Sequence, residues 1–205
     1  MGTGICIVPE HHPIALAKRV ASLDSLSNGR FLFGIGAGWN AEELENHGVR
    51  FADRWKVTDE SIRAMKECWT KKAASFHGKF VSFDPVWVEP KPAQKPHPPI
   101  LIGASSKWAI ERVAEYGDGW LPILGSFDLA ASLAQLERAC EKRGRDRRTL
   151  SVSVFGAPPD KAALEKLAKQ GVGRVLTGIP PVPEADALKL LDQQAELVSW
   201  ARDLG

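Results

Sequence analysis

The sequence predicts an α/β protein built on parallel strands. Short β-rich segments alternate with segments of helical period, in repeating units of about thirty residues. Strands that alternate with helices run parallel and are joined by right-handed crossovers. The clearest junction is RFLFGIGAGWNAEE at residues 30–43, where an apolar run becomes glycine-rich and opens into an acid-led helix. Such junctions lie at the carboxyl ends of strands, where α/β proteins bind ligands.

The first half of the chain supplies three of the six expected strands of this alternating pattern. These strands are Thr3–Val8, Arg30–Ile35 and Ile100–Gly103. The helices between them carry apolar residues at helical spacing. They are Pro13–Leu26, Ala41–Asn46 and Thr58–Thr70. On the first helix the residues expected to face inward are Ile14, Ala17, Val20, Ala21 and Leu26, and on the third they are Ile62, Met65 and Trp69.

The second half repeats the alternation. Its expected strands are Gly119–Leu124, Leu150–Phe155 and Arg174–Thr177. Its expected helices are Lys107–Tyr116, Asp128–Arg143, Asp160–Gln170 and Glu184–Asp203. The chain therefore contains six βα units in all.

The segment 71–99 interrupts this rhythm. It holds six of the fourteen prolines, and FHGKFVSF followed by VWV predicts two short antiparallel strands. The tail PKPAQKPHPP must be extended, because proline excludes helix for itself and its predecessor. This insertion is expected to be either a lid over the catalytic face or a flap that only covers the barrel.

Two architectures are compatible with parallel strands. Gly34, Gly36 and Gly38 form GxGxG and not the GxGxxG turn of a dinucleotide-binding fold, and no acid ends the following strand. A (β/α)₈ barrel suits the unit length better but needs eight units. Because Met1 directly precedes a strand, we expect a single barrel domain, residues 1–205, that lacks its first two βα units and starts at its third strand.

Composition excludes several functions. A formal net charge of +2 provides no basic field for nucleic acid or membrane, and no apolar run is long enough to span a bilayer. No secretory signal follows Met1, so a cytoplasmic protein is expected. Cys6, Cys68 and Cys140 are widely spaced and are expected to be small core residues without a metal or disulfide.

Trp39 is the first candidate functional residue. It follows the side-chain-poor backbone around Gly38, just past a barrel strand, where an aromatic ring can form the wall of a pocket. Asn40 and Glu43 have the spacing of a capping box, which by itself would explain both residues.

The best anion site is Gly103–Ser106. The strand ILI ends in Gly103, and Ala104, Ser105 and Ser106 lead into a helix. Free amides and hydroxyls at a helix N-terminus can hold a phosphate. One serine is explained as a cap, but two exceed what capping needs. Trp120, one unit later, is expected in the barrel interior or on the pocket rim.

Two adjacent histidines, His11 and His12, follow the first strand on the same loop face. A metal role is disfavoured because adjacent side chains point apart and no further ligand spacing is visible. A substrate or proton-relay role is the alternative, and His12 is taken as the candidate. His47, His77 and His97 are scattered and are expected to be solvated.

Together these segments resemble the carboxyl-terminal two-thirds of bacterial-luciferase-like oxidoreductases. The similar segments, in order, are GTGICIVPEHHPIALAKRVASLDSLSNGRF, GIGAGWNAEEL, the run Trp55–Thr70, FHGKFVSF, PKPAQKPHPPILIGASS and GDGWLP. Within the superfamily the chain is most similar to the branch that depends on the deazaflavin coenzyme F420. The resemblance covers nearly the whole chain but leaves the first two βα units of the family without a counterpart.

The resemblance implies a set of site residues. The family places a bulged strand, often with a non-prolyl cis peptide, behind the coenzyme ring, and here that bond is Gly4–Ile5. An ordinary barrel strand is the plainer alternative. The family binds the coenzyme's phosphate near Gly103–Ser106, and Gly38 and Asn40 would border the ring.

Three functions follow from these observations. The first is hydride transfer between coenzyme F420 and a small organic substrate, with the protein supplying orientation and exclusion of water. The second is an FMN-dependent monooxygenase fed by a separate reductase. The third is a truncated, non-catalytic paralogue, or a fragment that completes its barrel with another chain. A homo-oligomer is also compatible with the sequence.

Overall fold

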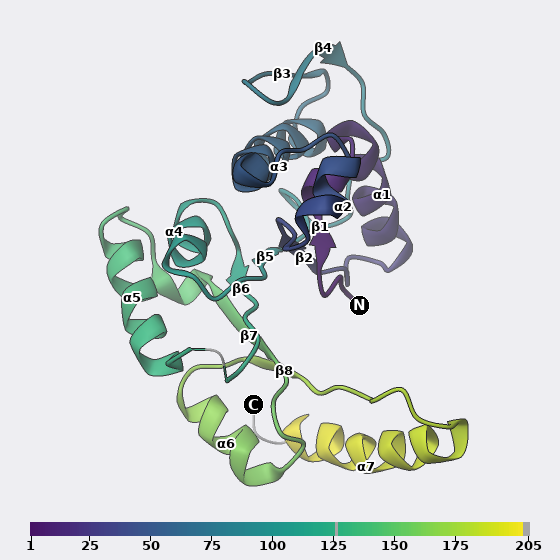
Figure 1. The fold of residues 1–205 in the computed structure, drawn as a ribbon, viewed down its shortest axis with the longest axis vertical. Coiled ribbons are helices and arrows are strands. Elements are labelled where there is room, and N and C mark those ends of the chain that lie inside the picture. The colour runs from purple at the N-terminus through teal and green to yellow at the C-terminus, as the bar shows by residue number, and fades with distance from the viewer. Residues whose placement is uncertain (126, 203–205) are drawn as a thin grey trace. The chain divides into compact units, whose positions relative to one another are not determined.

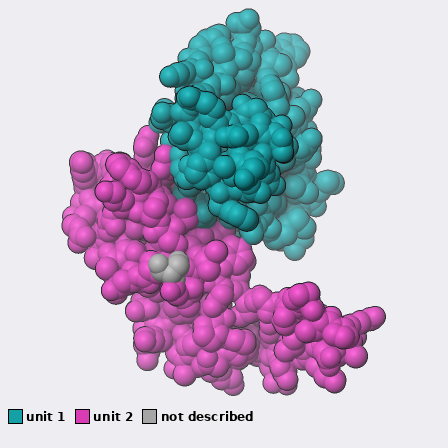
Figure 2. Space-filling view, in the orientation of Figure 1, with its two compact units in different colours: residues 1–103 teal, residues 104–205 magenta. Residues whose placement is uncertain are grey.

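The structure is a computed structural model that describes residues 1–125 and 127–202. It consists of two compact units, residues 1–103 and 104–205, shown in different colours in Figure 2. Figure 1 labels the helices and strands of both units. The expected end of the last helix at Asp203 lies outside the described residues.

Three parallel strands form the sheet of the first unit. They are β1 (Cys6–Ile7), β2 (Phe33–Gly36) and β5 (Ile100–Ile102), with β2 between the other two. Cys6 lies opposite Ile35, and Phe33 lies opposite Ile100. All four residues of β2 are buried, as expected for a parallel strand that is covered on both faces.

Helices α1 (Pro13–Leu26) and α3 (Arg54–Thr70) pack together in this unit. Trp69 on α3 donates its indole N–H to the carbonyl of Ala17 on α1 at 3.0 Å. Ile62, Met65 and Trp69 are buried, as predicted. Leu26 was expected inward but is 86% exposed, because it lies in the last turn of α1, beyond the packed part of the helix.

The third predicted helix begins earlier than its sequence indicated. The expected start was Thr58, whereas α3 starts at Arg54 after the 3-10 turn η2 (Phe51–Asp53). The Thr58 hydroxyl donates to the carbonyl of Arg54 at 2.8 Å, so it bonds back along the helix and does not cap it. Asp53 forms ion pairs with Arg50 and Lys56 at this helix start.

The insertion forms the expected hairpin. Strands β3 (Ala74–His77) and β4 (Ser82–Val86) pair antiparallel beside α3. The Glu60 carboxylate of α3 accepts the backbone N–H groups of Lys79, Phe80 and Val81 at 3.1, 2.6 and 2.9 Å. The hairpin turn is therefore tied to the middle of α3.

The extended tail of the insertion is pinned to the amino-terminal side of the unit 1 sheet. Gln94 donates its backbone N–H and its side-chain amide to the buried Asp24 near the end of α1, at 2.8 and 2.6 Å. The same amide also donates to the carbonyl of Phe31, which precedes β2, at 2.8 Å. Lys91 donates to the carbonyls of Cys68 and Lys71 at the end of α3. The tail therefore lies at the end of the sheet opposite the carboxyl ends of the strands, which favours the covering flap over the lid for this part of the insertion.

The second unit repeats the parallel pattern. Strand β7 (Ser151–Phe155) pairs with β6 (Gly119–Trp120) on one side and β8 (Arg174–Leu176) on the other. The predicted strand Gly119–Leu124 is shorter because only one isolated bridge, Ile123 to Phe155, continues the pairing beyond Trp120. Its helices are α4 (Lys107–Glu115), α5 (Leu129–Glu141), α6 (Lys161–Lys169) and α7 (Glu184–Arg202).

Side-chain caps set the starts of three of these helices. The side chains of Ser106, Asp128 and Asp160 accept the backbone N–H of the third residue of α4, α5 and α6, at 3.2, 3.0 and 2.9 Å respectively.

Helix α7 differs from the other helices of this unit in its burial, since none of its 19 residues is buried. Leu188, Leu191 and Val198 are among its exposed apolar side chains.

Across the described ranges, no helix is both long and apolar enough to cross a membrane. The two outermost strands have open edges. Within the described residues β1 pairs only with β2, and β8 pairs only with β7.

Candidate functional site

The carboxyl ends of β1, β2 and β5 meet at one edge of the first unit, because these strands are parallel. The segments that leave this edge are Val8–His12 after β1, Ala37–Asn40 after β2, and Gly103 after β5. They include every candidate residue of the first unit that follows a strand. This edge is the candidate site, since ligands of α/β proteins bind outside the carboxyl ends of the strands.

Ile5 forms an apolar ledge at this edge. The Gly4–Ile5 peptide bond is cis, as the family resemblance implied. The Ile5 side chain lies against the backbone of Gly36 and Gly103: a Cβ added to Gly36 would overlap Cδ1 of Ile5, and one added to Gly103 would lie 2.5 Å from its Cγ2. Ile5 remains 36% exposed. Two glycines thus let a branched side chain lie flat over β2 and β5 while one face stays open.

Trp39 projects from the loop between β2 and α2 (Ala41–Asn46). It is 84% exposed, so a core role is excluded. The preceding Gly38 has φ +80°, and a Cβ there would lie 3.1 Å from Ile7 and 3.3 Å from Leu44. Glycine is required at this position for both reasons. The indole is therefore presented on the candidate edge by a tightly packed turn.

Asn40 acts as the N-cap of α2. Its side-chain oxygen accepts the backbone N–H of Glu43 at 3.4 Å. Among residues 40–46, the Glu43 carboxylate does not accept the backbone N–H of Asn40 in return. Only half of the predicted capping box therefore forms. Capping accounts for Asn40 without a ligand role, although the side chain stays at the candidate edge.

The predicted anion turn continues into the second unit. Ser106 caps α4 through its bond to Ala109, as one serine was expected to do. Ala104 is held by the buried Trp120, whose indole N–H donates to the Ala104 carbonyl at 2.7 Å. Trp120 therefore belongs to the interior and fixes the turn from behind. Ser105 is half-buried between these two anchored positions.

The two histidines after β1 differ in their surroundings. His12 is exposed, and its side chain makes no capping bond at the start of α1. His11 is half-buried. Burial lowers the pKa of the His11 imidazole below its ordinary value; nearby Arg19 and His47 lower it further, and Glu10 opposes them. His47 is exposed and lies near enough to His11 to affect its pKa. The sequence did not indicate this proximity, because the two histidines are 36 positions apart.

The other histidines and the cysteines have structural roles. His77 is exposed as expected and contacts the Ser82 hydroxyl in the hairpin. His97 is half-buried and not solvated as expected, because its ring packs 5.7 Å from that of the buried Trp69. Cys68 and Cys140 are buried as predicted, and Cys6 is half-buried. No group of three or more His, Cys, Asp or Glu residues in the described ranges has the arrangement of a metal site.

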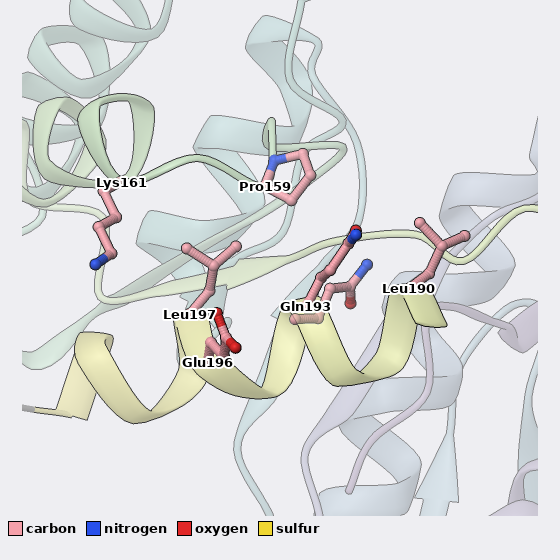
Figure 3. A pocket seen from close by; sticks show the side chains of 7 residues that line it. Pro159, Lys161, Leu190, Gln193, Glu196 and Leu197 are labelled. Carbon is pink, nitrogen blue, oxygen red and sulfur yellow. The ribbon is translucent and has the colours of Figure 1, made fainter. Parts of the chain in front are cut away.

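A separate groove of about 330 Å³ lies within the second unit, between the start of α6 and α7 (Figure 3). Figure 3 shows Leu190 and Leu197 of α7 on one side and Pro159 and Lys161 on the other. The Lys161 amine lies 5.6 Å from the ring centroid of Trp200. None of the predicted site residues lines this groove.

The parallel strands and the helices between them define an α/β protein, and the glycine-backed ledge lies at the edge where such proteins bind ligands. Comparison with known proteins identifies which kind. Residues 1–198 match the family described as luciferase-like monooxygenase. The chain belongs to this family.

Three relatives illustrate the similarity. An uncharacterized protein of Mycobacterium tuberculosis, Rv0953c, is 37% identical over 201 residues, which cover 95% of this chain and 69% of that protein. The F420-dependent hydroxymycolic acid dehydrogenase of the same species is 28% identical, covering 82% of this chain and 47% of the relative. The FMNH(2)-dependent dimethylsulfone monooxygenase of Pseudomonas putida is 35% identical over 109 residues, covering 52% of this chain and 30% of the relative.

The fold also matches solved structures. The coenzyme F420 dependent tetrahydromethanopterin reductase of Methanopyrus kandleri aligns with a TM-score of 0.74 and 18% identity, covering 94% of this chain and 81% of that one. The α/β barrel fold of the luciferase-like family is thereby supported, while both F420-dependent and FMN-dependent enzymes occur among the relatives.

Proposed function

We propose that the chain is an oxidoreductase that transfers a hydride between coenzyme F420 and a small organic substrate. The family supplies the oxidoreductase class. The F420-dependent dehydrogenase of Mycobacterium tuberculosis, similar along 82% of this chain, supports the choice of coenzyme.

The Ile5 ledge is the observation that carries the proposal. A planar ring needs a flat apolar support with little side-chain bulk behind it, and Ile5 on the backbones of Gly36 and Gly103 provides that support. Its exposed face lies at the carboxyl ends of three parallel strands. The residues of the first unit therefore fit the ring of a deazaflavin or a flavin.

The coenzyme's phosphate would be held by the turn Gly103–Ser106. The backbone amides at the start of α4 are oriented for an anion, and the bond from Trp120 to Ala104 keeps the turn in place. Since the Ser106 hydroxyl is engaged as the α4 cap, we expect the backbone amides of the turn to contribute more than the Ser106 side chain.

When bound, the coenzyme supplies a ring carbon that accepts or gives up a hydride. The protein's own part is positional. Ile5 supports one face of the ring, Trp39 forms a wall that excludes water, and Gly38 holds Trp39 in place through its contacts with Ile7 and Leu44. Asn40 would border the ring while it caps α2.

Equilibrium binding tests this role directly. Titration calorimetry with F420 should show that Ile5→Ala weakens binding about tenfold, because it removes roughly 1–2 kcal/mol of apolar contact. Leu26→Ala is the matched control, since Leu26 is an exposed aliphatic residue at the far end of α1. Equal affinity of the wild type and the Ile5 variant would exclude the ledge as the ring support.

An FMN-dependent monooxygenase, supplied by a separate reductase, is the second candidate. The Pseudomonas putida relative supports it, with 35% identity over half of this chain. Parallel titrations with F420 and with reduced FMN distinguish the two candidate functions. The Ile5 ledge fits either ring, so the comparison rests on which coenzyme binds more tightly. Tighter binding of reduced FMN would replace the first proposal by the second.

We also propose that the chain is one barrel domain made of six βα units, corresponding to the third to eighth strands of the family's barrel. The open edges of β1 and β8 support this. In that case a non-catalytic role, or completion of the barrel by another chain, is the third candidate. Absence of binding to either coenzyme by a folded protein would favour it.

A further inference from the structure

Helix α7 exposes a row of apolar side chains along one face. Leu188, Leu191 and Val198 are 52%, 47% and 53% exposed, and Ala195 between them is exposed as well. Their spacing of three, four and three positions places all four on the same side of the helix. We call these four residues the α7 stripe. A stripe of this spacing is the pattern by which one helix packs along another.

A different face of α7 attaches the helix to the second unit. The Thr177 hydroxyl, just after β8, donates to the Gln194 side chain at 2.8 Å. Leu190 and Leu197 are half-buried and line the groove in Figure 3. Successive residues lie about 100° apart around a helix, so this attached face and the α7 stripe are neighbours that point in different directions. Val198, at the border between them, is still 53% exposed.

Two opposite charges end the α7 stripe. Glu184 precedes Leu188 by four positions, and Arg202 follows Val198 by four positions. Residues four positions apart share a helix face, so both charges continue the stripe. Both side chains are exposed. The α7 stripe therefore has an acidic end, an apolar middle and a basic end.

The apolar middle of the stripe matches itself when two copies of α7 run antiparallel. One antiparallel register places Leu188 opposite Val198 of a second copy. The same register places Leu191 opposite Ala195, so a large side chain meets a small one and the two helices can approach closely. A two-fold axis between the copies forms each of these contacts twice.

The charges select the antiparallel direction. In the register just described, Glu184 lies opposite Arg202 of the second copy, and the two-fold axis repeats this pair at the other end. A parallel pair of helices would instead place Glu184 opposite Glu184 and Arg202 opposite Arg202. The charge pattern therefore fits a second copy of this chain in one orientation.

We propose that two copies of the chain associate through α7, with their α7 stripes packed antiparallel and a Glu184–Arg202 ion pair at each end. This association does not depend on the coenzyme or on hydride transfer. Apolar contact supplies most of the affinity, because exposed ion pairs contribute little and act chiefly on orientation. A single pair of helices is a small interface, so the dimer should form reversibly and dissociate on dilution.

Charge reversal in the 205-residue chain tests the proposal, with the dimer dissociation constant measured by sedimentation equilibrium. Glu184→Arg or Arg202→Glu alone places like charges together at both ends and should raise this constant about tenfold. The double variant has opposite charges again and should return to within about threefold of the wild type. Glu196→Arg, an exposed reversal on another face of α7, is the matched control and should leave the constant unchanged.

Mixing the two single variants provides a second measurement. Chains with Glu184→Arg should pair with chains with Arg202→Glu more tightly than either variant pairs with itself, because the facing ends then carry opposite charges. Recovery in the double variant cannot arise within one helix, since both reversed charges oppose the helix dipole. A wild type that stays monomeric at all concentrations would overturn the proposal. So would a double variant as weak as the single ones, or association and aggregation that neither single reversal alters.

Discussion

At the scale of single residues, Gly36 and Gly103 determine whether the Ile5 side chain can lie flat on the sheet. Both approach the Ile5 side chain so closely that an added Cβ would collide with it, and the Cβ on Gly103 would also lie 3.0 Å from the Ile35 carbonyl. Neither glycine needs a positive φ, so close approach and not backbone conformation explains them. A side chain at either position would lift Ile5 off the sheet and remove the flat surface proposed for the coenzyme ring.

Trp39 gives a prediction that separates a binding role from a packing role. Because the indole is 84% exposed, Trp39→Ala should change the free energy of unfolding by less than about 0.5 kcal/mol. A core tryptophan would cost about 3–5 kcal/mol. Coenzyme or substrate affinity should fall in Trp39→Ala and be largely retained in Trp39→Phe. Urea denaturation with parallel calorimetry measures both. A large loss of stability with normal affinity would contradict the exposed pocket-wall role.

The two serines after Gly103 should also behave differently. Ser106→Ala should destabilise the fold by about 1 kcal/mol through loss of the α4 cap, whereas Ser106→Asp should largely restore stability. Ser105→Ala together with Ser106→Ala should weaken coenzyme binding by about 1–3 kcal/mol if the turn holds its phosphate. Thermal unfolding and calorimetry report the two effects separately, and an unchanged affinity of the double variant would remove this phosphate site.

Helices were predicted more accurately than strands at the scale of the elements. Helices α1 and α2 have the predicted bounds, because Pro13 and Asn40 mark their starts in the sequence itself. Strand lengths depend on partners that the local sequence does not contain. The predicted Thr3–Val8 is reduced to Cys6–Ile7 because only those residues form a continuous ladder with β2.

Site features that depend on a short stretch of sequence, such as glycine turns, could be predicted. Features that depend on contacts between distant segments could not. GIGAG and the Gly103 turn pointed to the carboxyl edge, and the cis bond at Gly4–Ile5 came from family resemblance. The burial of Asp24 had no signal in the sequence, because it depends on how separate elements pack.

Glu60 supplies the prediction for the hairpin β3–β4. Burial acts to raise the pKa of its carboxyl, but three backbone N–H donors and Arg63 outweigh burial, so the pKa lies below its ordinary value. A lowered carboxyl pKa means that this stabilisation is present above the unfolded-state pKa and is lost as the pH falls through the folded-state pKa.

Glu60→Gln should therefore lower stability at pH 7 by about 1–2 kcal/mol and flatten the acid side of the stability curve. Hydrogen exchange should rise first at Lys79, Phe80 and Val81, whose N–H groups lose the charged acceptor. Glu42→Gln, at an exposed position in α2, is the control. Unchanged exchange in the hairpin turn of Glu60→Gln would show that the anchor is not needed.

The whole molecule exposes surfaces that a closed barrel would cover. In the first unit the outer edge of β1 has no partner strand among the described residues, and in the second unit the same is true of β8. Helix α7 adds Leu188, Leu191 and Val198, all exposed, and buries none of its residues. Unpaired strand edges and exposed apolar helix faces promote association between chains.

We therefore expect the isolated 205-residue chain to self-associate, to aggregate, or to bind coenzyme only weakly. Two βα units added before Met1 should restore a monodisperse, coenzyme-binding protein. Sedimentation velocity over a range of concentrations, with and without F420, measures this. Substitution of Leu188 and Leu191 by glutamine should reduce association if α7 contributes to it. A stable monomer that binds F420 with micromolar affinity would show instead that six βα units suffice, and that α7 and the open edges are tolerated in solution.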